Sequence, residues 1–346
     1  MKAAVTERPG SMRIVDVPDA DAPGNGEVLV RPEAVGLCGS DFHYYLGHLG
    51  DAVGPDLYPR VQGHEFAGVV DAVGPDCPDG LRAGERVAVW PLTACGHCYP
   101  CRIGRRNVCS NISLVGIHRD GALQERVRVP ADQVFPVGDL GPAVSALIEP
   151  VSIAVRAIVR ARIEAGEKAV VFGAGPIGQA VACAAVDRGA SVLLVDRVAR
   201  RVERGRTLGA DLLVLDQDAD LVAAGREWAG DEGPEVVFEA TGVPELLQTA
   251  VRLVSQAGRV VVVGLSTHDA PLRVGDLAFR EIDLLGVSCC NGNEFAEAVA
   301  LVSRRQEALA GLVTHEFSLD ETPSAIDYAI RHPAEVMKAM IRLEGA

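Results

Sequence analysis

The sequence predicts an α/β protein of two domains, on three observations. The chain has 346 residues, 48% of them hydrophobic, which is more than a single core usually holds. Up to about residue 136, short apolar runs alternate with Pro, Gly and Asp clusters, as in all-β regions. After Glu149-Pro150, almost fully apolar runs alternate with helical patterns, which is typical of a doubly wound parallel sheet covered by helices. We therefore expect residues 1–151 and 288–346 to form a discontinuous β-rich domain, and residues 152–287 to form the parallel-sheet domain.

The β-rich region is expected to contain modest strands connected by long loops. A strand-like segment opens the chain, and turn-forming residues such as Pro23-Gly24-Asn25-Gly26 and Gly74-Pro75-Asp76 separate the later runs. The expected strands are Met1–Val5, Val28–Val30, Ala67–Val73 and Arg86–Trp90.

The second region begins with the helical spacing of Val151, Ala154, Val155 and Ile158. Six buried strands should follow, at Lys168–Phe172, Ser191–Val195, Leu212–Leu215, Val236–Glu239, Arg259–Val263 and Leu284–Val287. The remaining pattern predicts a helix, a strand, a second helix and a strand, at Glu294–Ser303, Val313–Phe317, Pro323–Ile330 and Lys338–Leu343. We expect the last strand to return to the first domain.

Charge and composition exclude several classes of partner. The formal net charge of −14 argues against binding to nucleic acid or to an anionic membrane. The longest apolar stretch, Ala169–Val186, is interrupted by glycine and proline, so we expect it to be a buried strand and helix rather than a membrane span. The odd count of nine cysteines and the absence of a signal peptide disfavour a disulfide framework and predict a cytoplasmic protein.

A glycine motif lies between the first parallel strand and a helix expected at Gln179–Arg188. The motif is Gly173-Ala174-Gly175-Pro176-Ile177-Gly178, which suits a dinucleotide pyrophosphate at a helix N-terminus, the Rossmann arrangement. Asp196 ends the next strand, where an acid binds the adenosine ribose hydroxyls and repels a 2′-phosphate, so NAD is favoured over NADP. Arg197 weakens this preference, and Arg201 is a further expected cofactor contact. The alternative is a glycine cluster that only packs a helix.

Four of the nine cysteines, Cys95, Cys98, Cys101 and Cys109, lie within fifteen residues. Four thiolates complete a tetrahedral zinc shell with no open position, so this site is expected to be structural. An iron–sulfur cluster or unliganded thiols are the alternatives.

A second group of metal-binding residue types lies in the β-rich region. It comprises Cys38-Gly39-Ser40-Asp41-Phe42-His43 and Gly63-His64-Glu65. Glu149 joins this group from the point where the β-rich pattern gives way to alternating apolar runs and helices. Thiolate, imidazole and carboxylate together suit a zinc ion that keeps a position open for water or substrate.

Together these motifs resemble the zinc-containing medium-chain alcohol and polyol dehydrogenases, over essentially the whole chain. The sorbitol dehydrogenase branch is the most similar, because of Ile148-Glu149-Pro150 and Arg280-Glu281-Ile282-Asp283. The resemblance implies a GroES-like catalytic domain beside the Rossmann domain, and dimers or tetramers of the chain.

The resemblance also implies the roles of individual residues. Cys38, His64 and Glu65 would bind the catalytic zinc, with Glu149 meeting it directly or through water. Asp41 would orient His64, and Lys338 would offset the charge of Glu65. Ser40 would take the alcohol proton and His43 would pass it on towards solvent. The expected reaction is NAD-linked oxidation of a secondary alcohol in a sugar alcohol or sugar acid.

The substrate itself stays open. Cys289-Cys290 occupies the place where sorbitol-type enzymes carry an arginine that holds substrate hydroxyls. His118 and Arg119 are expected near the pocket mouth, where they would suit a carboxylate, and Tyr44 either lines the pocket or packs in the core. The alternatives are an L-threonine-type amino-alcohol dehydrogenase, a non-catalytic dinucleotide-binding scaffold, and a zinc-ribbon nucleic-acid binder, which the charge opposes.

Overall fold

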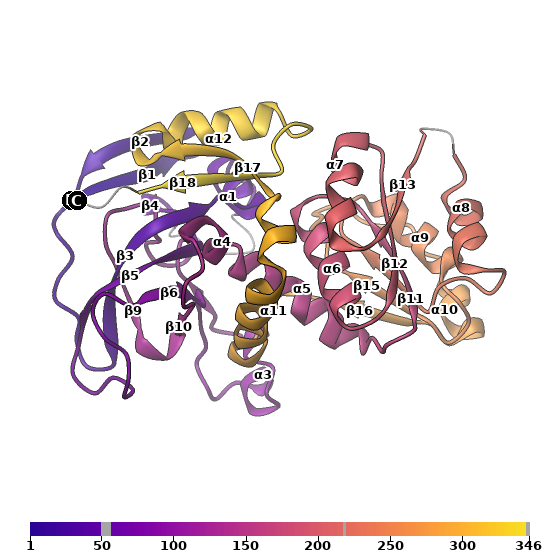
Figure 1. Ribbon diagram of the computed structural model, residues 1–346, viewed down its shortest axis with the longest axis horizontal. Helices are drawn as coiled ribbons and strands as arrows, with labels where there is room; N and C mark the ends of the chain where they lie inside the picture. Colours follow the sequence, from indigo (N-terminus) through magenta and orange to yellow (C-terminus); the bar gives the residue numbers. More distant parts are fainter. Residues whose placement is uncertain (50–56, 217–218, 344–346) are drawn as a thin grey trace. The chain divides into compact units, whose positions relative to one another are not determined.

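The computed structural model describes residues 1–49, 57–216 and 219–343, and divides into two compact units (Figure 1). The first unit combines Met1–Glu149 with Asn291–Ala346, and the second is Pro150–Cys290. The first unit is therefore discontinuous in sequence.

The first unit is built on two β-sheets. The smaller one has the strand order β2-β1-β4, and the larger has the order β10-β6-β5-β3-β18-β17, with β9 also pairing with β3. The strands are β1 (Lys2–Arg8), β2 (Ser11–Asp16), β3 (Glu27–Gly36), β4 (Arg60–Val61), β5 (Glu65–Val73), β6 (Arg86–Val89), β9 (Val127–Pro130), β10 (Val134–Pro136), β17 (Val313–Ser318) and β18 (Lys338–Arg342). The C-terminal strand β18 returns to this unit, as expected, and pairs with β3, so that Met340 lies opposite Gly36.

The first unit also contains helices of four to 19 residues and one small hairpin. The helices are α1 (Gly39–Tyr45), α3 (Tyr99–Arg102), α4 (Pro142–Ala146), α11 (Gly292–Ala310) and α12 (Thr322–Arg331), and the hairpin pairs β7 (Leu92–Thr93) with β8 (Ser113–Leu114). The core under the sheets is a hydrophobic cluster that includes Val28, Val30, Phe66 and Ile341.

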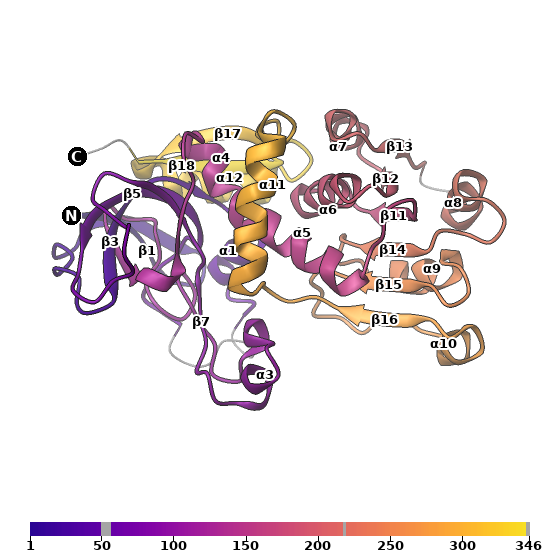
Figure 2. The ribbon, with the colours of Figure 1, turned by 60° about the horizontal axis from the view of Figure 1, so that its bottom comes forward.

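The second unit is a six-stranded parallel sheet of order β13-β12-β11-β14-β15-β16 (Figure 2). Its strands are β11 (Lys168–Phe172), β12 (Ser191–Asp196), β13 (Asp211–Val214), β14 (Val236–Glu239), β15 (Arg259–Val262) and β16 (Asp283–Gly286). Its helices are α6 (Pro176–Asp187), α7 (Ala199–Arg204), α8 (Leu221–Ala229), α9 (Pro244–Leu253) and α10 (Val274–Arg280). The predicted doubly wound sheet is confirmed, and its order reverses between β11 and β14, where such sheets bind ligands.

The helix α5 (Ile148–Ala161) starts in the first unit and continues in the second. The stretch Pro142–Ala161, which spans α4 and α5, is long and apolar enough to cross a membrane, with a mean hydropathy of 1.6 in its most apolar window. However, 72% of that window is buried inside the structure, which is typical of a core helix.

Element ends differ from the expected ones by a few residues, but one strand is much longer than expected. The run Val28–Val30 lies near the start of the ten-residue β3, whereas the segment expected at Met1–Val5 corresponds to β1, which ends at Arg8. The second half of β3 was not predicted because it begins with the polar residues Arg31 and Glu33 on either side of Pro32, and proline is unusual inside a sheet. The register shifts between Pro32 and Ala34, which accommodates the proline in the sheet.

Candidate functional site

Three donor side chains of different chemistry meet in the first unit. Cys38 directly precedes α1, Glu65 begins β5, and His64 lies just before Glu65. One ligand atom from each residue lies within 4.8 Å of the others. Gly36 pairs with Glu65 across the sheet, and a side chain on Gly36 would collide with the Glu65 carboxylate. The absence of a side chain at Gly36 therefore leaves room for the Glu65 carboxylate.

Asp41 lies behind His64 and is held by the backbone. Its Oδ1 is 3.6 Å from His64 Nδ1, and its Oδ2 accepts a hydrogen bond of 2.9 Å from the backbone N–H of Cys38. Burial raises the pKa of this carboxyl, but the imidazole of His64 and the Cys38 N–H together hold it below its usual value. The structure thus brings the predicted orienting acid to the predicted imidazole ligand.

Lys338 forms a buried ion pair with Glu65. Its Nζ lies 2.8 Å from Oε1 and 2.6 Å from Oε2 of Glu65, and also donates to the backbone carbonyl of Leu37 at 3.1 Å. Burial alone would lower the pKa of Lys338, but the Glu65 carboxylate raises it. The lysine therefore stays charged and compensates one buried carboxylate.

The donor group gathers several buried ionisable side chains. Asp41, Glu65 and Glu149 are buried acids close enough to influence one another, and Lys338 lies among them. Burial lowers the pKa of His64, but the Asp41 carboxylate raises it well above its usual value. Burial and the Glu65 carboxylate raise the pKa of Glu149 and the His64 imidazole lowers it, which leaves it at about 7. A divalent cation would stabilise the charged carboxylates, and thiolate, imidazole and carboxylate are donors that zinc accepts. The residues therefore fit a zinc ion, although Glu149 is not within the 4.8 Å donor group.

Ser40 and His43 lie one turn apart on α1, so their side chains share one face of the helix. The Oγ of Ser40 is 3.4 Å from Nε2 of His64, which places the hydroxyl beside the donor group. Partial burial lowers the pKa of His43, and the nearby ring of His48, 5.8 Å away, lowers it further. His43 is consequently neutral near pH 7 and able to accept a proton.

The four predicted structural cysteines also converge. The sulfur atoms of Cys95, Cys98, Cys101 and Cys109 all lie within 4.8 Å of one another. The Sγ of Cys98 is 3.3 Å from that of Cys101 and 3.7 Å from that of Cys109, near the spacing of about 3.8 Å that a tetrahedral zinc–sulfur shell requires. Backbone N–H groups of His97 and Cys98 lower the pKa of Cys95 to about 5. Burial raises the pKa of Cys101 to about 12, so the sulfur geometry rather than titration carries the assignment: four cysteine sulfurs at this spacing fit a closed zinc site.

The glycine motif of the second unit adopts the predicted strand–turn–helix geometry. Gly173 has φ +96° and packs against Thr241, and a side chain on Gly178 would collide with the carbonyl of Gly173. Open space lies beside Gly175, which caps the N-terminus of α6, and Pro176 and Ile177 form the first turn of that helix. A phosphate could therefore approach the backbone at the helix N-terminus.

A cavity of about 670 Å³ extends from this turn along the ends of β11, β12 and β14. Gly173, Gly175, Asp196, Arg197 and Arg201 line it, and its wall is largely apolar. Asp196 is fixed by backbone donors, because Oδ2 accepts from Ala174 N at 2.8 Å and Oδ1 from Val198 N at 2.9 Å. The remaining lone pairs of this carboxylate are suited to ribose hydroxyls.

Sequence reasoning missed the far wall of the cavity, which is the turn after β14. The buried carboxylate of Glu239 accepts hydrogen bonds from the N–H groups of Thr241 and Gly242, and Thr241 and Val243 line the cavity. The available signal was the run Glu239-Ala240-Thr241-Gly242, a turn at the carboxyl end of a strand beside the point where the sheet order reverses.

Several residues expected to contact the substrate instead pack or form hydrogen bonds within the protein. Tyr44 is 1% exposed and its hydroxyl donates to the backbone carbonyl of Leu57, so it belongs to the core. Arg119 donates to Thr93 Oγ1 at 3.0 Å and to Gln133 Oε1 at 2.9 Å, which ties its guanidinium to the sheet domain and leaves the predicted carboxylate contact without support. His118 Nδ1 accepts from Leu114 N at 3.1 Å. Cys289 belongs to the second unit and adopts a strained backbone with φ +46°.

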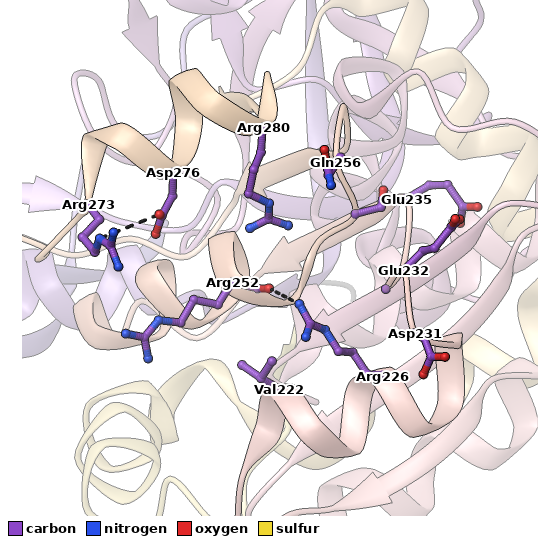
Figure 3. A pocket seen from close by; sticks show the side chains of 12 residues that line it. Val222, Arg226, Asp231, Glu232, Glu235, Arg252, Gln256, Arg273, Asp276 and Arg280 are labelled. Atoms are coloured by element: carbon purple, nitrogen blue, oxygen red, sulfur yellow. Dashed lines mark hydrogen bonds and ion pairs between the residues drawn. The ribbon is translucent and has the colours of Figure 1, made fainter.

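A larger cavity of about 990 Å³ in the second unit has a structural explanation (Figure 3). Arg226 donates to the carbonyl of Arg252, and Arg280 donates to the carbonyls of Val251 and Val254. These carbonyls belong to the C-terminal end of α9, where arginines satisfy unpaired acceptors and the helix dipole. Arg226 and Arg280 therefore stabilise a helix end.

Comparison with known protein families gives two adjacent matches. Residues 24–139 match the alcohol dehydrogenase GroES-like domain, and residues 176–304 match the zinc-binding dehydrogenase family. The two matches cover most of the chain and fall largely in the first and second structural units, respectively.

Individual relatives align over nearly the full length. Sorbitol dehydrogenase of Bacillus subtilis is 33% identical, covering 99% of this chain and 97% of that protein. The 2-dehydro-3-deoxy-L-galactonate 5-dehydrogenase of Pseudoalteromonas atlantica is 35% identical, covering 93% of both chains. Among solved structures, the alcohol dehydrogenase RspB of Escherichia coli, complexed with NADH, has a TM-score of 0.86 at 32% identity and covers 99% of both chains.

Proposed function

The chain belongs to the zinc-binding alcohol dehydrogenase family, and from this we propose that it is an NAD-linked dehydrogenase that oxidises a secondary alcohol of a sugar alcohol or sugar acid to the ketone. The observation that carries the proposal is the convergence of Cys38, His64 and Glu65 within 4.8 Å. Relatives that act on sorbitol and on a sugar acid support this substrate class.

Cys38, His64 and Glu65 would hold the catalytic zinc, and the four cysteines of the lobe would hold a second, structural zinc. When bound, the catalytic zinc supplies a Lewis acid that favours loss of the alcohol proton. Asp41 keeps the His64 imidazole oriented, and Lys338 limits the repulsion between Glu65 and its acidic neighbours.

Ser40 and His43 would carry the proton away from the substrate. The Ser40 hydroxyl lies beside the donor group and can both accept and donate a proton. His43 is one helical turn further along α1, and its lowered pKa keeps it in the neutral form that accepts the proton.

The two units would divide the reaction between them. The first unit would bind the alcohol and zinc, and the second would bind NAD, with Gly173, Gly175 and Gly178 at the pyrophosphate and Asp196 at the adenosine ribose. We further propose that the protein is cytoplasmic and forms a homodimer or homotetramer, without nucleic-acid or membrane partners.

A substrate panel tests the proposed function. Purified zinc-loaded protein is incubated with NAD and pentitols, hexitols, aldonates, inositols or amino alcohols, and NADH formation is followed by absorbance. We expect at least one polyol or sugar acid to give a kcat/KM at least tenfold above that of L-threonine. Activity restricted to L-threonine would favour an amino-alcohol dehydrogenase, and no reduction of NAD with any alcohol would favour a non-catalytic scaffold.

Cofactor choice should depend on Asp196. An Asp196→Ala variant is expected to raise the KM for NAD about tenfold or more, because a hydrogen bond to a charged acceptor contributes about 1.5–3 kcal/mol. The same change removes the repulsion of a 2′-phosphate, so the ratio of kcat/KM for NADP to that for NAD should rise. Steady-state kinetics with both cofactors measures both effects.

Asp211→Ala provides the matched control, because Asp211 is an acid of the same sheet that accepts a hydrogen bond from Trp228 outside the cavity. Unchanged cofactor preference in Asp196→Ala would contradict the ribose role, and would point to Arg197 and Arg201 as the determinants.

A further inference from the structure

We propose that Gln62 is a positioning residue of the catalytic metal site, which fixes the Asp41 carboxylate and, through it, the imidazole of His64. The inference rests on the proposed function, since it concerns the same zinc site. Gln62 is the residue after β4 and precedes Gly63-His64, and none of its surface is exposed.

The side chain of Gln62 connects two buried groups. Its Nε2 donates to the backbone carbonyl of Asp41 at 3.0 Å and to Asp41 Oδ1 at 3.3 Å. Its Oε1 accepts a hydrogen bond of 2.6 Å from the hydroxyl of Thr6, a fully buried residue of β1. In the part of the chain that the structure describes, Thr6 and Asp41 are the hydrogen-bonding partners of this amide.

The donors and acceptors of Thr6 and Asp41 determine the direction of each hydrogen bond that Gln62 makes with them. Both oxygens of Asp41 can only accept, so the NH₂ end of Gln62 must face them. The amide oxygen must then face Thr6, whose hydroxyl has to donate. Amide orientation is thus determined by the network and does not depend on an arbitrary choice of N and O positions.

Through Asp41, Gln62 also influences the orientation of the metal ligand His64. Gln62 holds Oδ1 of Asp41, and the backbone N–H of Cys38 holds Oδ2, so both carboxylate oxygens are fixed. Oδ1 is also the carboxylate oxygen 3.6 Å from His64 Nδ1, so its negative charge favours a proton on Nδ1. A proton on Nδ1 leaves the lone pair of Nε2 free, as a zinc ligand requires.

A leucine or methionine would fill the volume of Gln62 without the energetic cost of burying an amide. A buried amide at this position is therefore best explained by its bonds to Asp41 and Thr6. Removal of a group that contacts a metal ligand directly, as Asp41 contacts His64, typically changes metal affinity 10- to 100-fold. Gln62 acts through Asp41, so we expect its removal to have an effect at the lower end of that range.

The experiment compares Gln62→Met with the unmodified protein in a zinc-release assay. Zinc-loaded protein is titrated with a chelator, and alkylation of the Cys38 thiol by iodoacetamide is measured by peptide mass spectrometry, since zinc protects this ligand. We expect Cys38 in Gln62→Met to become alkylated at a chelator concentration about tenfold lower. Alkylation at the same concentration in both proteins would overturn the proposal.

Gln133→Met is the matched control for a purely structural effect. Gln133 is a buried glutamine of the same unit that donates to Leu92 O at 2.8 Å and Thr93 Oγ1 at 2.6 Å. Its loss should lower thermal stability without changing the protection of Cys38. An equal loss of protection in both variants would show that general destabilisation releases the zinc, and would also overturn the proposal.

Two substitutions of Thr6 test the same hydrogen-bond network should Gln62→Met fail to fold. Thr6→Val removes the hydroxyl at nearly constant volume, so Cys38 should become alkylated at a lower chelator concentration than in the unmodified protein. Thr6→Ser keeps the hydroxyl donor, so Cys38 should stay protected to the same concentration as in the unmodified protein. Equal protection in Thr6→Val and Thr6→Ser would contradict the inference. Because the assay needs no substrate, Gln62-dependent protection in a protein that oxidises no alcohol would reject only the proposed function.

Discussion

Replacing Cys38 by serine is expected to lower kcat/KM at least about a thousandfold while the protein stays folded. A Lewis acid at the substrate oxygen contributes several kcal/mol to the transition state, and about 4 kcal/mol corresponds to a factor of a thousand. The fold should persist because serine is itself a favourable residue at the start of a helix, the position that Cys38 holds before α1.

Steady-state kinetics, zinc analysis and circular dichroism measure the three expected results together. Zinc content should fall from about two ions per chain towards one, because the lobe cysteines are untouched, and His64→Ala should behave in the same way. Cys77→Ser is the control, since the Cys77 thiol donates to the carbonyl of Glu27 at 3.2 Å and a hydroxyl can do the same. A Cys38→Ser protein with two zinc ions and a rate within tenfold of the unmodified protein would contradict the assignment of Cys38.

The parts of this structure that could be predicted from sequence are those determined by local spacing. The four lobe cysteines lie within fifteen residues, and the glycine turn is contiguous with its strand and helix, so chain connectivity alone brings these groups together. The apolar strands β11 and β14 have the expected bounds, because both faces of a central parallel strand are buried.

What could not be predicted depends on contacts between distant segments. Nothing near Gln62 in the sequence indicates Thr6, which is 56 residues away and becomes its partner only through the pairing of β1 with β4. The contacts of Arg119 could not be predicted for the same reason, since its partners Thr93 and Gln133 come from separate segments. The three donors Cys38, His64 and Glu65 were assigned from resemblance to a family, because their spacing alone does not define a site.

The second large effect is expected in the lobe, where Cys98→Ser should allow rapid local cleavage by trypsin. A four-thiolate zinc site contributes on the order of 10 kcal/mol to the order of its segment, and the loss of one ligand removes a large part of that. The lobe has little apolar packing of its own, because α3 buries none of its residues and the adjoining hairpin strands β7 and β8 have two residues each. It is also tied by the buried Asn107, whose N–H donates to Asn291 Oδ1 at 3.1 Å. We therefore expect zinc content to fall by one ion and cleavage after Arg102, Arg105 or Arg106 to accelerate at least about a hundredfold.

Hydride transfer should respond differently from local stability in this variant. The ligands Cys38, His64 and Glu65 lie outside the lobe, so uncleaved Cys98→Ser protein should keep kcat within about threefold of the unmodified value. Timed trypsin digestion followed by mass spectrometry measures the local stability of the lobe, and kinetics on the intact fraction measure hydride transfer. Metal analysis gives the zinc content, and Cys77→Ser is the control. Unchanged trypsin resistance together with two zinc ions would mean that the lobe is held by its own packing. Iron in place of the second zinc would instead identify a cluster, because four thiolates at this spacing can bind either metal.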